Sequence, residues 1–156
     1  MGSEMCIRDR LITEWTARGL DVATIKHAHH EFEADTTGKD SWRHRKAGAR
    51  QVLVSSAIRS AHFVEHETTE PDLAQLLNRL LPCDLVLIEG FKREAVPKME
   101  IFRFEVGKPH LYTEDNQIIA VASDSAVPDC PLPVLDLNDI PTIADFVLQV
   151  VDLSSR

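Results

Sequence analysis

The sequence predicts an α/β protein whose sheet is largely parallel. Short apolar runs rich in β-branched residues alternate along the chain with segments of helical periodicity, which is the pattern of βαβ units. One strand candidate, DLVLIEG at residues 84–90, is apolar almost throughout, as strands buried on both faces of a parallel sheet are. At 156 residues the chain has room for one domain.

The N-terminal half begins with a helix. Leu11, Ile12 and Trp15 recur at helical spacing, and Gly19 is typical of a helix C-terminus, so the helix is expected to end at Arg18. After it we expect a strand at 20–25, a polar loop at 28–39, a short helix ending near Gly48 with Asp40 and Ser41 as its caps, and strands at 51–56 and 61–66.

The C-terminal half predicts two further helices. One opens at Pro71 and Asp72, ends at Pro82, and carries leucines at 73, 76, 77, 80 and 81. Between the helices we expect strands at 84–90, 99–104 and 117–123. The last helix starts at Asp139 and Pro141, and one of its faces is expected to present Ile143, Phe146, Val147 and Val150.

The composition excludes several classes of protein. With 17 Lys and Arg against 25 Asp and Glu, the net charge of −8 argues against a nucleic-acid binder that neutralises phosphates. Cys6, Cys83 and Cys130 form no C-x-x-C pair, so neither a disulfide framework nor a four-thiolate zinc site is expected. The longest apolar run, residues 118–122, is far shorter than the ~18 residues of a membrane span. No secretory signal is evident, and we expect a cytoplasmic protein without membrane partners.

Polar residues stand at the ends of the expected strands, where ligands of α/β sheets bind. Each taken alone is more simply a solvated or capping residue, and their shared edge is what makes them a candidate site. Glu89 is the most informative of them, because a carboxylate closing an apolar strand needs a cation, a metal-bound water or backbone donors as its partner. The residues concerned are Lys26, His27, Ser55, Ser56, Glu89, Gly90, Ser123 and Asp124.

The short helix carries a local concentration of positive charge. Arg43, Lys46 and Arg50 share one helical face by spacing, and Arg45 lies in the same stretch. Two interpretations stay open: a solvated helix face, or contact of Arg43, Arg45 and Lys46 with a phosphorylated ligand. Asp40 and Ser41 supply an oxygen pair that suits Mg²⁺, which usually takes one or two carboxylates together with substrate phosphates.

Other site types were weighed against the same sequence. Neither Gly38-Lys39 nor Gly107-Lys108 completes the G-x-x-x-x-G-K-[ST] pattern of a phosphate-binding loop. His27, His29 and His30 could form a metal site, although anion contact or solvation is the simpler interpretation. There is no G-x-S-x-G elbow for a hydrolase triad.

Five blocks, in order and spacing, resemble the molybdopterin-guanine dinucleotide biosynthesis adaptor family, MobB, over about residues 11–150. They are IKHAHHEFEAD, GKDSWRHRKAGA, DLVLIEGFK, IIAVASD and LDLNDIPTIADFV. The resemblance implies a three-layer P-loop NTPase-like fold. It also implies a dimeric adaptor of the bacterial cytoplasm that binds GTP and Mg²⁺ and assists the molybdopterin guanylyltransferase attaching GMP to molybdopterin, with at most weak GTPase activity.

The resemblance also implies roles for single residues. Glu89-Gly90 looks like the strand end that holds the water of a bound magnesium ion, and Asp40-Ser41 looks like a switch-like segment near the γ-phosphate. Lys26 and His27 would line the same edge. Asp124 stands where related folds place groups that contact the base, and its carboxylate could accept from guanine N–H groups.

The first ten residues depart from the family pattern. MGSEMCIRDR stands where the family has a hydrophobic strand and a G-x-x-x-x-G-K-T-T loop, so residues 1–10 resemble a non-native segment, truncated or misjoined before Leu11, ahead of a single domain at 11–156. We therefore expect poor nucleotide binding and unpaired strand edges. A histidine-based metal-binding protein and a nucleotide-free interaction module are the alternative functions.

Overall fold

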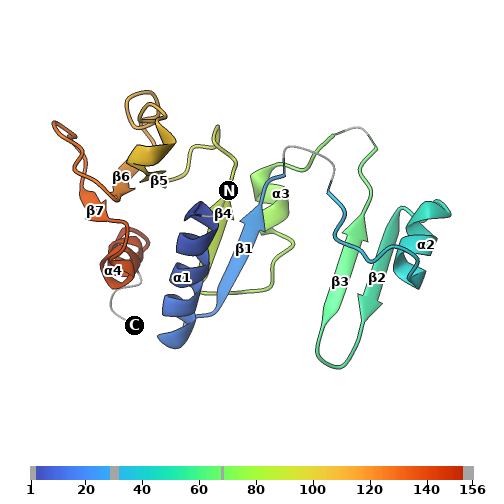
Figure 1. Ribbon diagram of the computed structural model, residues 1–156. Coiled ribbons are helices and arrows are strands. Elements are labelled where there is room, and N and C mark those ends of the chain that lie inside the picture. The colour runs from blue at the N-terminus through green and yellow to red at the C-terminus, as the bar shows by residue number, and fades with distance from the viewer. Residues whose placement is uncertain (1–2, 29–31, 68, 153–156) are drawn as a thin grey trace. The chain divides into compact units, whose positions relative to one another are not determined.

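The computed structural model describes residues 3–28, 32–67 and 69–152 of the chain. The chain divides into two compact units: residues 1–25 with 81–156, called here the α/β unit, and residues 26–80, called here the hairpin unit. Figure 1 labels the elements of both.

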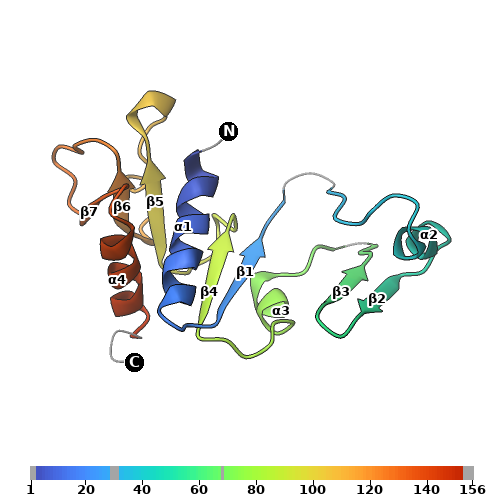
Figure 2. The same cartoon turned by 60° about the horizontal axis from the view of Figure 1, so that its bottom comes forward.

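Parallel strands form the sheets of the α/β unit. β1 (Val22–Lys26) pairs with β4 (Leu85–Glu89), and their arrows run in the same direction in Figures 1 and 2. A second sheet holds β5 (Lys98–Phe102), β6 (Ile118–Ser123) and β7 (Val134–Asp136), all parallel. The 3-10 helix η1 (Phe104–Val106) follows β5. The parallel α/β class expected from the sequence is confirmed, whereas β7 was not expected.

Two helices build the core of the α/β unit. Ile7, Leu11 and Trp15 lie on one face of α1 (Ser3–Ala17), because they are spaced four residues apart, and all three are buried. They share one apolar cluster with residues of α4 (Ile140–Val150) and of the sheets, and Figure 2 shows the two helices side by side. Ile7 belongs to the first ten residues, and it lies in this core. The other members are Leu85, Ala122, Leu137, Ile140, Ile143, Ala144 and Leu148.

The buried face of α4 differs in part from the one expected. Asp139 caps this helix, with its side chain accepting from the Thr142 N–H, and Pro141 lies in the first turn as the sequence indicates. Ile143 is buried, but Val150 is 40% exposed, because Ala144 and Leu148 fill the positions that face α1 and the sheet. The helix is therefore rotated slightly from the orientation that Phe146 and Val150 predicted.

A short helix and an antiparallel hairpin form most of the hairpin unit. β2 (Gln51–Ser55) pairs with β3 (Ser60–Val64) from Gln51 opposite Val64 to Ser55 opposite Ser60. The turn between them is closed by the Ser56 N–H, which donates to the Arg59 carbonyl at 2.8 Å. α2 (Asp40–Lys46) precedes β2 and contacts it. This hairpin is the antiparallel part of a fold that is otherwise parallel.

The leucine-rich helix is shorter than its sequence pattern indicates. α3 runs from Leu73 to Leu77, with the expected Asp72 cap and a capping box completed by Gln75. The chain then tightens, as Arg79 and Leu80 donate to carbonyls three residues back. Leu81 is 85% exposed. Because packing of an apolar face supplies most helical stability, a leucine stripe that is left uncovered does not extend the helix.

Candidate functional site

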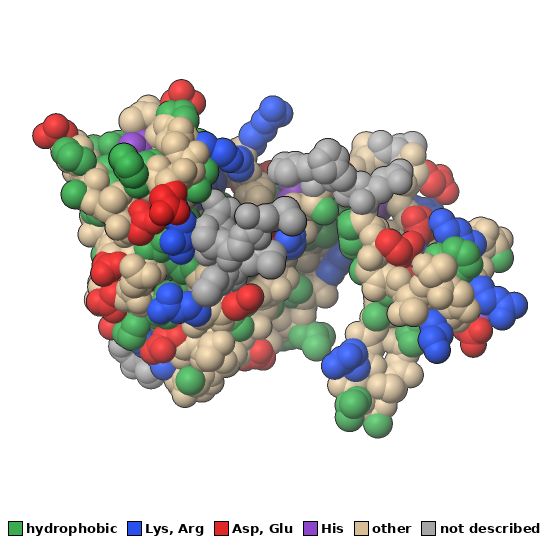
Figure 3. All heavy atoms as spheres, viewed as in Figure 1, with side chains coloured by type: hydrophobic (Ala, Val, Ile, Leu, Met, Phe, Trp, Pro, Cys, Tyr) green, Lys and Arg blue, Asp and Glu red, His purple; other side chains and the backbone are tan. Residues whose placement is uncertain are grey.

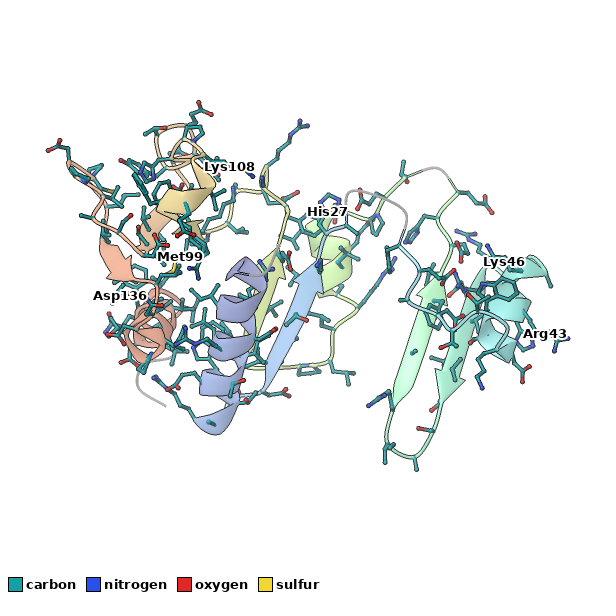
Figure 4. All side chains as sticks on the ribbon, viewed as in Figure 1. His27, Arg43, Lys46, Met99, Lys108 and Asp136 are labelled. Atoms are coloured by element: carbon teal, nitrogen blue, oxygen red, sulfur yellow. The ribbon has the colours of Figure 1, made fainter. Side chains whose placement is uncertain are left out.

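The exposed face of α2 presents the polar groups expected to meet a phosphorylated ligand. The Asp40 side chain is 87% exposed, and Arg43 is 70% exposed, with 3.9 Å between an Asp40 carboxylate oxygen and an Arg43 guanidinium nitrogen. Lys46 extends over the Trp42 ring, with its Nζ 5.8 Å from the ring centroid. Figure 4 labels Arg43 and Lys46 on this helix, and Figure 3 shows Lys and Arg side chains exposed around it. These cations are open to solvent and can accept an anion.

The start of α2 is built differently from the expectation. Lys39 is the N-cap residue and makes no side-chain capping bond. Ser41 instead donates its hydroxyl hydrogen to Asp35 Oδ1 at 2.8 Å. The expectation that Asp40 and Ser41 cap the helix is therefore wrong, because the acceptor for Ser41 comes from the preceding loop.

Arg45 is engaged within the protein and does not face an open phosphate site. Its side chain is 14% exposed, and its guanidinium bonds Glu65 at 2.9 Å, Asp35 at 3.3 Å and Glu33. The hydrogen bond to Glu65 is the largest of the effects that raise the pKa of Arg45. A guanidinium bound by three carboxylates has little capacity left for phosphate, so we remove Arg45 from the candidate contacts.

The histidine segment follows β1 directly. Lys26 is the last residue of β1, and His27 Nε2 lies 2.8 Å from Glu70 Oε1. His29 and His30 lie outside the described residues. Within residues 3–28, 32–67 and 69–152, no group of three or more His, Cys, Asp or Glu is arranged to hold a metal ion.

Glu89 is the last residue of β4, and it forms an ion pair. Its carboxylate lies 3.2 Å from the guanidinium of Arg8 on α1, and the two side chains are 32% and 21% exposed. Immediately afterwards the backbone turns through left-handed conformations at Gly90 (φ 90°) and Phe91 (φ 49°). A bulky residue rarely adopts a positive φ, so this strand end is held in an unusual shape.

Asp124 follows β6 and is tied to the segment after β5. One carboxylate oxygen accepts the Phe104 N–H at 3.2 Å, and the other lies 3.6 Å from Arg103. Ser123 is buried, and its hydroxyl oxygen accepts the Ser125 N–H at 3.1 Å. The carboxylate therefore holds η1 in place at this edge of the sheet.

Two charged residues of β5 that hold neighbouring segments were not expected from the sequence. Lys98 donates to the Lys92 carbonyl at 2.6 Å and to Asp115 at 2.8 Å, and so anchors the loop that follows Gly90. The hydrogen bond from Lys98 holds the pKa of Asp115 below its usual value. Glu100 is a buried carboxylate on an apolar strand. A charged residue inside an apolar run is the sequence signal by which it could have been found.

The candidate residues fall into two groups, each within one unit. Lys26, His27, Asp40, Ser41, Arg43 and Lys46 belong to the hairpin unit, whereas Glu89, Gly90 and Asp124 belong to the α/β unit. The common edge that the sequence suggests for all of them stays a prediction.

Comparison with known proteins decides the family. The model of the family described as Molybdopterin guanine dinucleotide synthesis protein B, MobB, matches residues 6–124. The chain belongs to this family. The MobB match begins within α1 and ends just after β6, so it covers the residues of both groups.

Two relatives agree over nearly the whole chain. The Molybdopterin-guanine dinucleotide biosynthesis adapter protein of Haemophilus influenzae is 43% identical over 143 residues, which are 89% of this chain and 78% of that protein. The adapter protein of the same name from Escherichia coli is 41% identical over 144 residues, covering 90% of this chain and 82% of its own.

Solved MobB structures share the fold. The crystal structure of Bacillus subtilis MobB matches with a TM-score of 0.73 at 27% identity, covering 94% of this chain and 90% of that one. A crystal structure titled molybdopterin-guanine biosynthesis protein B reaches a TM-score of 0.75 at 24% identity, covering 96% and 94%. The three-layer, P-loop NTPase-like class expected from the resemblance is confirmed by these neighbours.

The donor set does not fit a resident magnesium ion. Glu89 is already paired with Arg8, and Asp40 is a single, largely exposed carboxylate. A Mg²⁺ ion that uses one carboxylate keeps its other ligands from water and substrate phosphates. Such an ion would arrive with a nucleotide. On α2 itself, Arg43 and Lys46 are exposed, and the ion pair between Arg43 and Asp40 lies at the surface.

The helices of the described residues also bear on membrane association. In the described part of the chain, no helix is long and apolar enough to cross a membrane.

Proposed function

We propose that this chain is an adaptor in molybdopterin guanine dinucleotide biosynthesis, assisting the guanylyltransferase that attaches GMP to molybdopterin in the cytoplasm. The observation that carries the proposal is the identity of 41–43% with two adapter proteins over about nine tenths of the chain. An adaptor acts through surfaces that are open to its partner and to a nucleotide, and the exposed charged side chains of α2 are such a surface.

GTP is the nucleotide that we propose for this adaptor. Arg43 and Lys46 would contact its phosphates, and Asp40 would contribute an oxygen to the Mg²⁺ ion that accompanies them, with Ser41 next to it in the same first turn of α2. Lys26 and His27 would extend this contact at the end of β1. Within the α/β unit, Glu89, Gly90 and Asp124 are separately proposed as nucleotide contacts, and Asp124 is the residue proposed for the guanine.

Nucleotide binding by this chain should be weak. Its sequence contains no G-x-x-x-x-G-K-[ST] loop, so it lacks the backbone N–H groups and the lysine that such a loop brings to phosphates. Surface cations alone are screened by salt and bind anions loosely. We therefore propose at most a weak GTPase, in which the adaptor role does not depend on hydrolysis.

A homodimer is the proposed assembly, and the hairpin is its proposed contact. A two-stranded hairpin is only marginally stable alone, and its outer edges present unpaired N–H and C=O groups. Leu53 is 68% exposed on β2, and Ile58 at the turn is 92% exposed. Figure 3 shows apolar side chains at the end of this hairpin. A second hairpin would pair an edge and cover Leu53.

Binding to the guanylyltransferase tests the function. We would measure association of purified chain with immobilised guanylyltransferase, with and without MgGTP, using R43Q/K46Q as the variant that lacks the phosphate contacts. We expect saturable binding by the wild-type chain. A parallel calorimetric titration with MgGTP alone should show no saturation in the micromolar range. Absence of any association with the enzyme would contradict the adaptor proposal, and saturable micromolar GTP binding would contradict the weak nucleotide site.

A further inference from the structure

One carboxylate from the preceding loop holds the short helix α2. Asp35 Oδ1 accepts the Ser41 hydroxyl hydrogen at 2.8 Å and the Thr36 N–H at 2.9 Å, and Oδ2 accepts from Arg45 Nε at 3.3 Å. The Asp35 side chain is 7% exposed. Ser41 and Arg45 stand four positions apart, so they lie on the same helical face. The Asp35 carboxylate therefore bonds two side chains, Ser41 and Arg45, on one turn of α2.

The helix has little stability of its own. It has seven residues, none of them buried, and its N-cap makes no side-chain bond. Isolated helices shorter than about 12–15 residues are marginal in water. The order of α2 and the direction of its side chains consequently depend on bonds to neighbouring segments.

Arg45 extends the attachment to the hairpin. Its guanidinium bonds Glu65, the residue directly after β3, at 2.9 Å, and lies 5.2 Å from the centroid of the Phe63 ring. Glu33 supplies the third carboxylate. The chain of contacts from Ser41 through Asp35 to Arg45 thus connects loop, helix and hairpin.

We propose that Asp35 is the positioning residue for the phosphate-contacting face of α2: through Ser41 and Arg45 it fixes the direction in which Arg43 and Lys46 project, without touching the ligand. This inference rests on the proposed contact between α2 and nucleotide phosphates. It explains why Arg45, in the middle of a basic segment, is turned inward while its neighbours are exposed.

The charge state of Asp35 suits this role. Burial acts to raise the pKa of Asp35, but hydrogen bonds from Ser41, from the Thr36 N–H and from Arg45 outweigh burial and hold the pKa below its usual value. Asp35 is therefore ionised at neutral pH. The other charged groups around the same guanidinium are Glu33 and Glu65.

The two tryptophans of the chain provide the experiment. Trp42 lies in α2, whereas Trp15 is 1% exposed in the core of the α/β unit. With 5-fluorotryptophan labelling, ¹⁹F NMR gives one resonance for each, so Trp15 is an internal control for folding. Titration with MgGTP, followed at Trp42, measures even weak binding, while the spectrum without ligand reports the order of α2.

We expect D35A to shift or broaden the Trp42 resonance, to leave Trp15 unchanged, and to weaken MgGTP binding about five- to tenfold, because Arg43 and Lys46 would then have to be ordered when the ligand binds. At saturating MgGTP the Trp42 resonance should reach its wild-type position, because a positioning residue changes affinity and not the bound arrangement. S41A should weaken binding less, and should add little to D35A, since both remove the same bond.

The matched control is E65A, which removes a carboxylate from the same guanidinium but does not touch Ser41. Its MgGTP affinity should stay within about twofold of wild type, because Glu65 is half exposed.

Equal MgGTP affinity in D35A and wild type overturns the inference, as does a loss of affinity in E65A as large as in D35A. If D35A does not fold, an unchanged affinity in S41A overturns it instead. A different result would contradict the proposed phosphate contact itself. It is a wild-type Trp42 resonance that does not change at millimolar MgGTP, together with a D35A spectrum that differs from wild type in the absence of ligand.

Discussion

Glu100 shows how one buried side chain shapes the segment after η1. It lies on β5 and is 5% exposed, and its two carboxylate oxygens accept the N–H groups of Leu111 at 2.9 Å and Tyr112 at 3.0 Å. Each oxygen thus accepts a hydrogen bond from one backbone N–H group. A buried carboxylate retained in an apolar strand therefore has a structural reason.

Replacing this carboxylate by an amide should be costly. In E100Q one oxygen becomes an NH₂ group facing an N–H donor, so one bond to a charged acceptor is lost, at about 1.5–3 kcal/mol. Urea denaturation measures the change in the free energy of unfolding. E105Q, at an exposed position three residues after the end of β5, is the control, and its free energy of unfolding should lie close to that of the wild type. Equal stabilities of E100Q and E105Q would refute the role of Glu100.

The cap of α4 should make part of the stability pH-dependent. The Thr142 hydroxyl and N–H both donate to Asp139 and hold its pKa below the usual value. A carboxyl with a depressed folded-state pKa stabilises above its unfolded value of about 3.9, and that contribution is lost as the pH falls through the folded-state value. D139N should therefore melt below wild type at pH 7, with the difference in Tm shrinking as the pH is lowered below about 4. A difference in Tm that does not change with pH would rule this out.

At the scale of elements, α1 begins within the first ten residues and contributes one of them, Ile7, to the core. Ile7 is 2% exposed and shares the core with Leu11 and Trp15. I7A should lower the free energy of unfolding by about 2–5 kcal/mol, as truncation of a core isoleucine does. The exposed T13A on the same helix is the control. If I7A is no less stable than T13A in urea, residues 1–10 behave as the appended segment that the sequence suggests.

The hairpin makes a second prediction at this scale. A charge at position 53 should oppose the proposed pairing of two hairpins. The pairing would cover this side chain, and taking the ammonium group of a lysine out of water costs free energy. Sedimentation velocity should find the wild type as a dimer and L53K as a monomer. R59Q, in the hairpin turn, is a control that should remain dimeric. A dimer that persists in L53K would place the interface elsewhere.

Elements with local signals could be predicted, and those without could not. The apolar run of β4 and the start of α4 at Asp139 and Pro141 could be recognised in the sequence, the first through its continuous apolar residues and the second through its capping pattern. α3 was predicted too long, since its leucines show a helical period but nothing in the sequence says whether a partner covers them. β7 has only three residues, too few for a period of two to be recognised.

For the whole molecule, the residue types of the candidate site could be read from the sequence and their partners could not. Of the three kinds of partner expected for Glu89, a cation is present, and it is Arg8, far away in the chain. The inward turn of Arg45 depends on Glu33, Asp35 and Glu65, which no spacing rule connects. Long-range ion pairs arise from the tertiary fold, so a basic run by itself does not distinguish ligand contacts from internal bonds.

Formation of molybdopterin guanine dinucleotide tests the adaptor role most directly. Guanylyltransferase, molybdopterin and MgGTP are incubated with and without this chain, and the dinucleotide is quantified. We expect the chain to raise the rate of dinucleotide formation in a saturable manner, and R43Q/K46Q to raise it less. A rate that is the same with and without the wild-type chain would contradict the account.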